Sequence, residues 1–246
     1  MPPEPALRAV IMAGGRGSRL APYTAVLPKP LMPLSDRPII DVVLRQLARA
    51  GVGSISISVG HMGSLIEAWV SDQTGYGIPL EFVYEERPLG TAGALANVER
   101  PESTFLALNG DILTDLPFAQ LVEHNARHGS IATMAVKERT VDVQYGVVHA
   151  GDDGRVQRLE EKPQLAYTVS MGVYAMEPAI IDLIAPGERI DFPDLILRAI
   201  ERGHDVQTYR HLDYWRDIGN REDYETAIED FAREQETFIG PDAAAP

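Results

Sequence analysis

The sequence contains no cysteine, and this absence excludes several kinds of chemistry. The chain can form no disulfide, and it offers neither a thiolate nucleophile nor a cysteine-based metal site. Long apolar runs are also missing, since none approaches the roughly 18 residues that cross a membrane. Residues 1–5, MPPEP, lack both the basic and the apolar part of a secretory signal. We therefore expect a soluble cytoplasmic protein with no membrane partner.

Positive charge is scarce in the chain as a whole. The 22 Lys and Arg residues are outnumbered by 36 Asp and Glu residues, and the formal net charge is −14. Because phosphate backbones are held mainly by clustered Lys and Arg, this balance argues against a nucleic-acid partner. Residues 1–40 differ, because they carry a local charge of +3: Arg8, Arg16, Arg19, Lys29 and Arg37 against Glu4 and Asp36. The sequence therefore predicts a local site for a small anion.

Short apolar runs alternate with helix-period segments through the first half of the chain. Strands are expected at 9–12, 55–59, 80–84 and 105–108, and helices at 39–50, 65–70, 92–98 and 118–128. This alternation predicts an α/β fold with a Rossmann-like, doubly wound, predominantly parallel mixed sheet. In such a sheet, ligands bind beyond the carboxyl ends of the strands.

The second half of the chain is richer in strands. They are expected at 130–137, 146–149, 156–160, 169–176 and 206–209, with helices at 178–184, 192–202 and 221–236. Asp191 and Asn220 precede the last two helices and are expected to cap them. No linker divides the chain, so we predict one domain over 1–238, because α/β folds often reach about 200–250 residues as one unit. Residues 116–238 would form a strand-rich lobe on the same sheet, and residues 239–246 a disordered tail.

A glycine-rich turn follows the first apolar strand, with the sequence AGGRGSRL at residues 13–20. Main-chain N–H groups in such a turn approach a ligand without interference from Cβ atoms and can cradle an anion. The turn is not a dinucleotide fingerprint, because Leu20 stands where the third glycine is required, and no G-K-[ST] follows as in a P-loop. This disfavours a nicotinamide-dependent oxidoreductase. Lys29 lies between two prolines, which restrict the backbone and aim the lysine, so we expect it to bind a phosphate chain together with Arg16 and Arg19.

The stretch MAGGRGSRLAPYTAVLPKPLMPL, residues 12–34, resembles the signature of the sugar-1-phosphate nucleotidylyltransferases. This family includes mannose-1-phosphate guanylyltransferase and glucose-1-phosphate thymidylyltransferase. The resemblance continues in the family's order through PLGTAG (88–93), LNGD (108–111), YGVV (145–148), EKP (161–163) and YWRDIG (214–219). It covers nearly the whole chain. The Rossmann-like mixed sheet of the family agrees with the pattern of apolar runs.

The resemblance implies a role for each matching position. The nucleotide site, mostly in residues 1–115, would comprise Ala13, Gly14, Gly15, Arg16, Gly17, Ser18, Glu85, Pro88, Gly90, Thr91, Asn109 and Gly110. The sugar-phosphate site would comprise Tyr145, Gly146, Glu161, Lys162, Ser170 and Trp215, with Lys162 as the cation. Arg19, Lys29, Asp111 and Asp217 would be catalytic, and the two aspartates would hold Mg²⁺. Joining two anions calls for charge neutralisation and in-line positioning, and Mg²⁺ prefers oxygen ligands.

Several of these residues are ambiguous when each is taken alone. Asp111 could be a turn residue or a cap, and Asp217 could simply belong to the turn before the last helix. Lys162 could be a surface lysine. Their joint presence in the family's order favours the functional interpretation.

The resemblance implies that the nucleobase meets the stretch that precedes Pro88, which reads YEER at residues 84–87. A carboxylate accepts two hydrogen bonds and matches the adjacent N1–H and N2–H₂ donors of guanine, whereas thymine and uracil suit an amide better. We therefore favour GTP, with Glu85 as the base-binding residue. The alternative is that Glu85, Glu86 or both point to solvent, because side chains alternate at a strand end.

Two further features concern the sugar and a metal. VSMGVY at residues 169–174 departs from the Asn-Ala-Gly that is frequent in the family, which leaves the sugar open. Ser18 replaces the usual threonine and keeps the hydroxyl. His124 and His128 have the spacing of a two-histidine metal face, but Asn125 stands where the zinc-protease pattern needs Glu, so we interpret both as exposed helix residues.

We interpret the chain as an Mg²⁺-dependent transferase that converts NTP and sugar 1-phosphate into NDP-sugar and pyrophosphate. GTP with mannose 1-phosphate or manno-heptose 1-phosphate is the favoured pair. Thymidylyl or uridylyl transfer to glucose 1-phosphate or an amino-sugar 1-phosphate is the alternative, and a non-catalytic NDP-sugar-binding regulator is a second. The left-handed β-helix of longer relatives is not expected. The oligomeric state stays open, with a homo-oligomer among the options.

Overall fold

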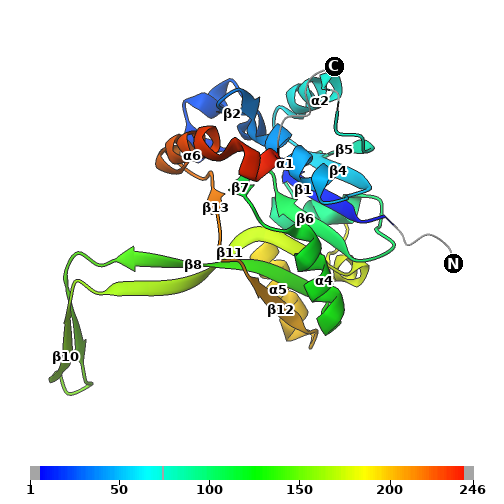
Figure 1. Ribbon diagram of the computed structural model, residues 1–246. Coiled ribbons are helices and arrows are strands. Elements are labelled where there is room, and N and C mark those ends of the chain that lie inside the picture. The colour runs from blue at the N-terminus through cyan, green and yellow to red at the C-terminus, as the bar shows by residue number, and fades with distance from the viewer. Residues whose placement is uncertain (1–5, 74, 241–246) are drawn as a thin grey trace.

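The computed structural model describes residues 6–73 and 75–240. A seven-stranded sheet runs through the molecule in the order β12–β8–β11–β6–β1–β4–β5 (Figure 1). Its strands are β1 (Arg8–Ala13), β4 (Ser54–Val59), β5 (Leu80–Tyr84), β6 (Phe105–Asn109), β8 (Ala132–Asp142), β11 (Gln164–Met176) and β12 (Val206–Arg210). β11 is antiparallel to both of its neighbours, whereas the other pairs are parallel. The predicted α/β fold with a mostly parallel mixed sheet is confirmed.

Helices cover both faces of this sheet. One face carries α1 (Ile39–Arg49), α2 (Gly63–Asp72) and α4 (Phe118–His128). The other carries α3 (Gly90–Gly93), η4 (Ala94–Asn97), η5 (Pro178–Leu183) and α5 (Phe192–Glu201). In β1, Ile11 packs into the first layer and Val10 into the second, because successive side chains of a strand point to opposite faces. A strand that is buried on both faces reads as an unbroken apolar run, which is what residues 9–12 show.

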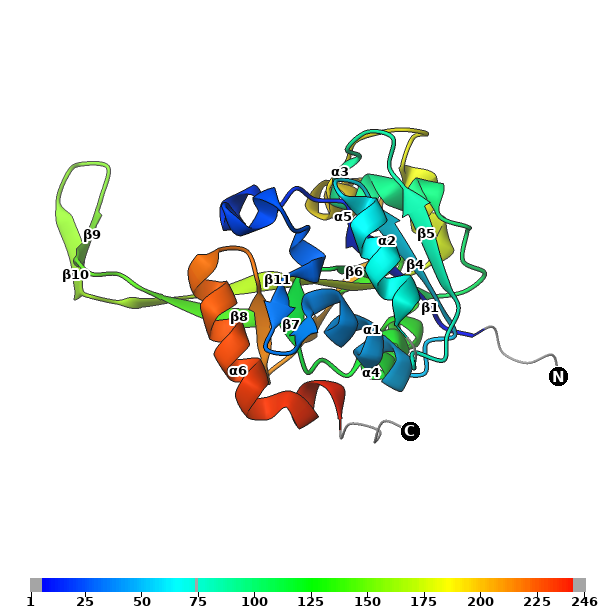
Figure 2. The same ribbon diagram turned by 90° about the horizontal axis from the view of Figure 1, so that it is seen from above.

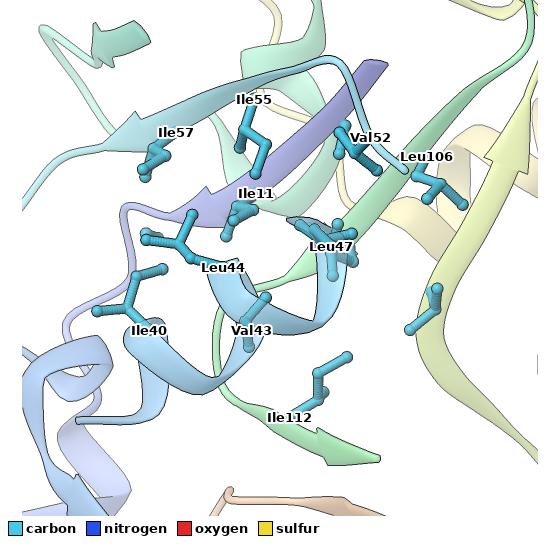
Figure 3. Packing of buried hydrophobic residues seen from close by; sticks show 14 of the residues in the cluster. Ile11, Ile40, Val43, Leu44, Leu47, Val52, Ile55, Ile57, Leu106 and Ile112 are labelled. Atoms are coloured by element: carbon cyan, nitrogen blue, oxygen red, sulfur yellow. The ribbon is translucent and has the colours of Figure 1, made fainter. Parts of the chain in front are cut away.

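Figure 3 shows α1 packed on the parallel strands. The buried residues of this layer include Ile40, Val43, Leu44 and Leu47 from the helix and Ile11, Ile55 and Ile57 from the strands. The helical residues recur at the spacing of one face of an α-helix. Burying an aliphatic side chain of this size contributes roughly 1.5–3 kcal/mol. The packing fixes the carboxyl end of β1, where the glycine-rich turn begins.

The last helix, α6 (Arg221–Ile239), packs beside α1 over a third apolar cluster and has a kink at Glu234 (φ −127°, ψ 32°). Asn220 caps it as predicted, because its side-chain oxygen accepts a hydrogen bond from the N–H of Asp223 at 3.0 Å. The prediction of a disordered tail from residue 239 onward is wrong for its first two residues. Ile239 ends this helix, and both Ile239 and Gly240 are buried. Residues 241–246 lie outside the described residues.

Several short elements of the structure were not predicted from the sequence. β7 (Ile112–Thr114) pairs with β13 (Trp215–Asp217), and β2 (Pro33–Leu34) pairs with β3 (Arg37–Pro38). The 3₁₀ helices η1 (Ser18–Leu20), η2 (Tyr23–Ala25) and η3 (Lys29–Leu31) follow the glycine-rich turn. Elements of two or three residues are too short to leave a periodic pattern. Within 6–73 and 75–240, no helix has the length and apolar character needed to cross a membrane.

A two-stranded arm projects from the sheet (Figures 1 and 2). β8 and β11 continue beyond the body, and β9 (Gly146–Ala150) and β10 (Val156–Glu161) form a hairpin at the far end. β8 and β11 are therefore longer than the predicted strands at 130–137 and 169–176. We define the arm as residues 138–169.

Candidate active site

The glycine-rich turn leaves the carboxyl end of β1 and enters η1. Gly17 adopts the left-handed conformation (φ 62°, ψ 27°), and its carbonyl accepts hydrogen bonds from the N–H of Leu20 and from Oγ1 of Thr24, both at 2.9 Å. A Cβ at Gly17 would lie 2.9 Å from Cγ2 of Thr24. A glycine is therefore required here for conformation and for space.

A cavity of about 440 Å³ opens beside this turn, beyond the ends of β1 and β6. It is lined by fifteen of the sixteen residues predicted for the nucleotide site and for catalysis: Ala13, Gly14, Gly15, Gly17, Ser18, Arg19, Lys29, Glu85, Pro88, Gly90, Thr91, Asn109, Gly110, Asp111 and Asp217. Arg16 is exposed and is absent from the lining. The sheet thus brings together residues that lie far apart in the sequence, at the edge where an α/β fold binds its ligands.

Lys29 extends into the cavity from η3 and is 7% exposed. Pro28 precedes it in an extended conformation (φ −63°, ψ 143°), and Pro30 stands in the first turn of η3. The Nζ of Lys29 donates a short hydrogen bond to Oδ2 of Asp111. A buried ammonium must be paired, and this carboxylate is its partner.

Asp217 reaches the same point through the short β7–β13 ladder. β13 places Asp217 opposite Ile112, and the N–H of Ile218 donates to the carbonyl oxygen of Asp111 at 3.0 Å. Burial and the neighbouring Asp111 carboxylate raise the pKa of Asp217 above its ordinary value, while Lys29 lowers it. Two carboxylates that repel each other in a buried site favour a cation between them.

Two oxygen atoms at this point have no hydrogen-bond partner. They are Oδ1 of Asp111 and Oδ1 of Asn109, and both are buried. Buried polar atoms are usually paired, so orphaned oxygens beside two carboxylates mark a position suited to a hard cation. In the described part of the chain, no group of three or more His, Cys, Asp or Glu could hold a metal ion. A cation here would take its remaining ligands from phosphate and water.

Gly219 lets Arg19 approach the carboxylate of Asp217. A Cβ at Gly219 would lie 2.7 Å from Oδ2 of Asp217 and 3.3 Å from a guanidinium nitrogen of Arg19. The exposed Arg19 therefore adds a second positive charge to the lining of the cavity, besides that of the buried Lys29. The charged groups of Lys29, Asp217 and Arg19 come from separate segments of the chain and line the same cavity.

Glu85 lines the cavity, whereas Glu86 is exposed and lies outside it. The carboxylate of Glu85 accepts a hydrogen bond from Oγ of Ser58 at 3.0 Å and one from the N–H of Leu89 at 3.0 Å. Each carboxylate oxygen has a second lone pair that can accept from a ligand. The contacts fix the orientation of Glu85 and leave it able to bind a donor.

A second cavity of about 410 Å³ adjoins the first. The two share Thr91, Asn109, Asp191 and Asp217, and the predicted sugar residues Ser170 and Trp215 line the second. The indole N–H of Trp215 donates to the carbonyl of Met171 at 3.0 Å, which fixes the ring as one wall. No Lys, Arg or His side chain is among the described residues that line this cavity.

Residues 8–234 match the family model of the nucleotidyl transferases. The chain belongs to this family. Mannose-1-phosphate guanylyltransferase of Mycobacterium tuberculosis is 30% identical over 231 residues, which are 92% of this chain and 64% of the relative. UTP–glucose-1-phosphate uridylyltransferase of Synechocystis sp. is 31% identical over 242 residues, 90% of this chain and 62% of the relative. The chain therefore spans a little under two thirds of the length of these curated relatives.

The fold of this chain also resembles that of a solved structure. HddC from Yersinia pseudotuberculosis, complexed with GMP-PN, aligns over 92% of this chain and 99% of its own with a TM-score of 0.70 and 27% sequence identity.

The structure does not bring all predicted sugar residues to the second cavity. Tyr145, Gly146, Glu161 and Lys162 lie on the arm, outside the residues that line either cavity. They are neighbours of one another, because Gly146 pairs with Glu161 and the N–H of Lys162 donates to the carbonyl of Tyr145 at 3.3 Å. Within one copy the arm holds these four residues apart from Ser170 and Trp215.

Six residues that line the first cavity were not predicted for the site: Met12, Leu20, Pro30, Arg189, Asp191 and Gly219. Asp191 was expected to cap α5, and this is wrong in detail, because its side chain accepts no cap hydrogen bond from that helix. Its Oδ1 accepts instead from the N–H and the hydroxyl of Thr91, at 2.7 and 3.2 Å. Only this long-range contact places Asp191 in the site.

The two histidines of α4 lie away from both cavities. His128 is exposed as expected, but His124 is half-buried with its ring against the edge of Tyr209 at 5.5 Å. The ring nitrogen Nδ1 of His128 lies 2.9 Å from the carbonyl oxygen of His124. The pair contributes to packing on the surface of the helix.

Proposed function

We propose that this chain is a sugar-1-phosphate nucleotidylyltransferase, which transfers a nucleotidyl group from an NTP to a sugar 1-phosphate. The observation that carries the proposal is the convergence of the glycine-rich turn with Lys29, Asp111 and Asp217 on one cavity that continues into a second. The first cavity would hold the nucleotide and the second the sugar. The shared wall is where the two substrates would react.

The reaction forms a bond between a phosphate oxygen of the sugar and the α-phosphorus of the NTP. It breaks the bond from that phosphorus to the oxygen that leads to the β-phosphate, so pyrophosphate leaves. Lys29 and Arg19 would neutralise the charge that develops on pyrophosphate, while the main-chain N–H groups of the turn would hold the phosphates in line. No covalent intermediate with the protein is needed.

Asp111 and Asp217 fit a magnesium site. Their carboxylates adjoin, and an oxygen of Asp111 and one of Asn109 are buried without a partner. When bound, Mg²⁺ would supply positive charge that offsets the repulsion between the two anionic substrates. The Lys29–Asp111 pair holds the carboxylate in place for this role.

GTP is the nucleotide that Glu85 favours. Glu85 lines the first cavity and accepts hydrogen bonds from Ser58 and Leu89, which orient its carboxylate. This supports its binding to the two adjacent N–H donors of guanine. For the sugar, we propose mannose 1-phosphate or manno-heptose 1-phosphate. We also place the reaction in the cytoplasm, where nucleoside triphosphates are made and used.

Pyrophosphate release tests the proposal. The purified chain is assayed with Mg²⁺ against GTP, ATP, CTP, UTP and dTTP, each combined with the 1-phosphates of mannose, manno-heptose, glucose and N-acetylglucosamine. Release with GTP and a manno-configured sugar is expected. If pyrophosphate is released only with UTP or dTTP, the assignment of GTP is wrong, while the proposed transfer reaction still stands. Tight binding of an NDP-sugar without any release favours a regulatory protein and overturns the proposed activity.

A further inference from the structure

The arm is separated from the body by the pattern of its strand pairing. β8 pairs with β12 only over residues 132–136, and β11 pairs with β6 only over 173–176. Beyond these points the two strands pair only with each other, as far as Asp142 and Gln164. Figures 1 and 2 show the arm extending away from the molecule in both views. Not one residue of 138–169 is buried.

The arm nevertheless carries large apolar side chains. Seven of the fourteen exposed large hydrophobic residues of the described chain lie on it: Val141, Tyr145, Val148, Val156, Leu159, Leu165 and Tyr167. Strand pairing sets Val141 opposite Leu165 and Val148 opposite Leu159, so apolar side chains gather on shared faces. An isolated two-stranded ribbon is at best marginally stable in water. Contiguous exposed apolar surface of this kind marks an interaction site.

No positively charged side chain is among the described residues that line the second cavity, whereas the arm carries Lys162. A sugar 1-phosphate is an anion, yet the described residues that line the cavity include Asp191 and Asp217 and no Lys, Arg or His. The guanidinium of Arg139, at the base of the arm, lies over the ring of Trp215 at 5.3 Å from its centroid and is not part of the lining.

Lys162 is exposed on the arm in a left-handed conformation (φ 46°) that a lysine rarely adopts. The N–H of Val143 donates to the carbonyl of Pro163 at 3.0 Å and helps hold this strained turn. Such strain is characteristic of functional positions.

We propose that the arm docks on a second copy of this chain and that Lys162 enters the sugar cavity of that copy. The inference rests on the proposed function, because it takes a sugar 1-phosphate as the ligand that needs the cation. Each copy has an exposed arm and a sugar cavity that no Lys, Arg or His of the described chain lines. In a dimer with a two-fold axis, each arm would pack on the other copy and place Lys162 in the cavity of that copy. For Lys162 to reach the sugar cavity of its own copy, the arm would have to bend back toward the body at the irregular pairing between Ser170 and Tyr174.

The mass of the protein in solution tests the contact. Light scattering coupled to size exclusion is expected to give twice the mass of one chain. The double variant Val148→Glu with Leu159→Lys keeps a favourable cross-strand pair and removes the apolar face, so it should be a folded monomer. The matched control Leu197→Glu with Ile200→Lys changes two exposed apolar residues of α5 and should stay dimeric. A monomeric wild type, or a double variant that stays dimeric, overturns the docking.

Complementation tests whether Lys162 acts in the partner. Lys29→Met disables the first cavity, and Lys162→Met disables the arm; each alone should be nearly inactive. Mixed dimers of the two contain one complete site, so co-expression with two affinity tags should restore about a quarter of the wild-type rate in an unfractionated sample. Mixed dimers without recovered activity would show that Lys162 serves its own copy. A wild type that transfers no nucleotide defeats the proposed function, while the mass measurement still decides the contact.

Discussion

The side chain of Lys29 is hydrogen-bonded to the carboxylate of Asp111, although the two residues are 82 positions apart in the sequence. The lysine comes from a 3₁₀ turn between prolines and the aspartate from the end of β6. The pair leaves one oxygen of Asp111 buried and free. This one contact joins the phosphate cradle to the position proposed for the metal.

Replacing Lys29 by Met should lower turnover by about 10²–10³-fold, because the variant keeps the apolar stem and loses the charge that faces the leaving pyrophosphate. The rate of pyrophosphate release measures the effect, and circular dichroism confirms that the variant is folded. Arg233→Met, which removes an exposed cation from α6, is the control and should keep the wild-type rate. A Lys29→Met rate near that of the control would contradict the assigned role.

Asp111→Asn and Asp217→Asn should each reduce turnover by a similar factor of about 10²–10³. Each loses one negative ligand, so the concentration of Mg²⁺ that gives half-maximal rate should also rise. A titration of rate against Mg²⁺ separates this effect from a general loss of activity. The control is Asp182→Asn, an exposed carboxylate paired with Arg100 on the surface, whose magnesium curve should match wild type.

Glu85→Gln should shift nucleotide preference away from GTP and toward UTP or dTTP, because an amide offers one donor and one acceptor. Competition between equal concentrations of nucleotides measures the preference. Glu86→Gln alters the neighbouring exposed glutamate and should leave the preference unchanged. Identical preferences for both variants would remove Glu85 from base recognition.

Gly17→Ala should destabilise the fold by about 1–2 kcal/mol, since a left-handed residue with a Cβ is strained and that atom would crowd Thr24. Denaturant unfolding measures the change. Gly15→Ala is the matched control in the same turn, where a Cβ would meet nothing within 4 Å, and its stability should equal that of wild type. Equal stability of both variants would show that the turn adapts to a side chain at residue 17.

The loop that carries Arg189 and Asp191 should lose stability at low pH. Hydrogen bonds to Arg198 at 2.6 and 2.8 Å, with one from Ala185, lower the pKa of Glu188 to about 2. Because the folded pKa lies below the ordinary value of 4.5, this stabilisation is present above 4.5 and is lost as the pH falls toward about 2.

Glu188→Gln should therefore flatten the pH dependence of the thermal midpoint in this window. Thermal scans from about pH 5 to pH 2 compare the variant with wild type. Glu201→Gln, an exposed residue at the end of the same helix as Arg198, should follow the wild-type curve. A Glu188→Gln curve that runs parallel to wild type would remove this ion pair from the acid response of the protein.

The sequence by itself determined the sheet, the order of its main elements and most of the first cavity. Buried parallel strands require unbroken apolar runs, and helices that cover them require a periodic apolar face, so both appear in the local pattern. Glycines and prolines around Lys29 are equally local, since they act on the backbone of their own turn. The fifteen predicted residues that line the first cavity were named by the resemblance of their motifs to the family, which is also a property of the sequence alone.

Only the tertiary structure decided which residues complete the site. Asp191 enters it through a contact with Thr91, which has no local signature. Asp217 was predicted from its motif, but the ladder of three residues that positions it was not. The arm is the clearest case, because the strands at its far end were predicted as ordinary strands of the second half of the chain. Periodicity tells which residues form a strand, but it does not tell where that strand leaves the sheet, because the position depends on pairing with distant segments.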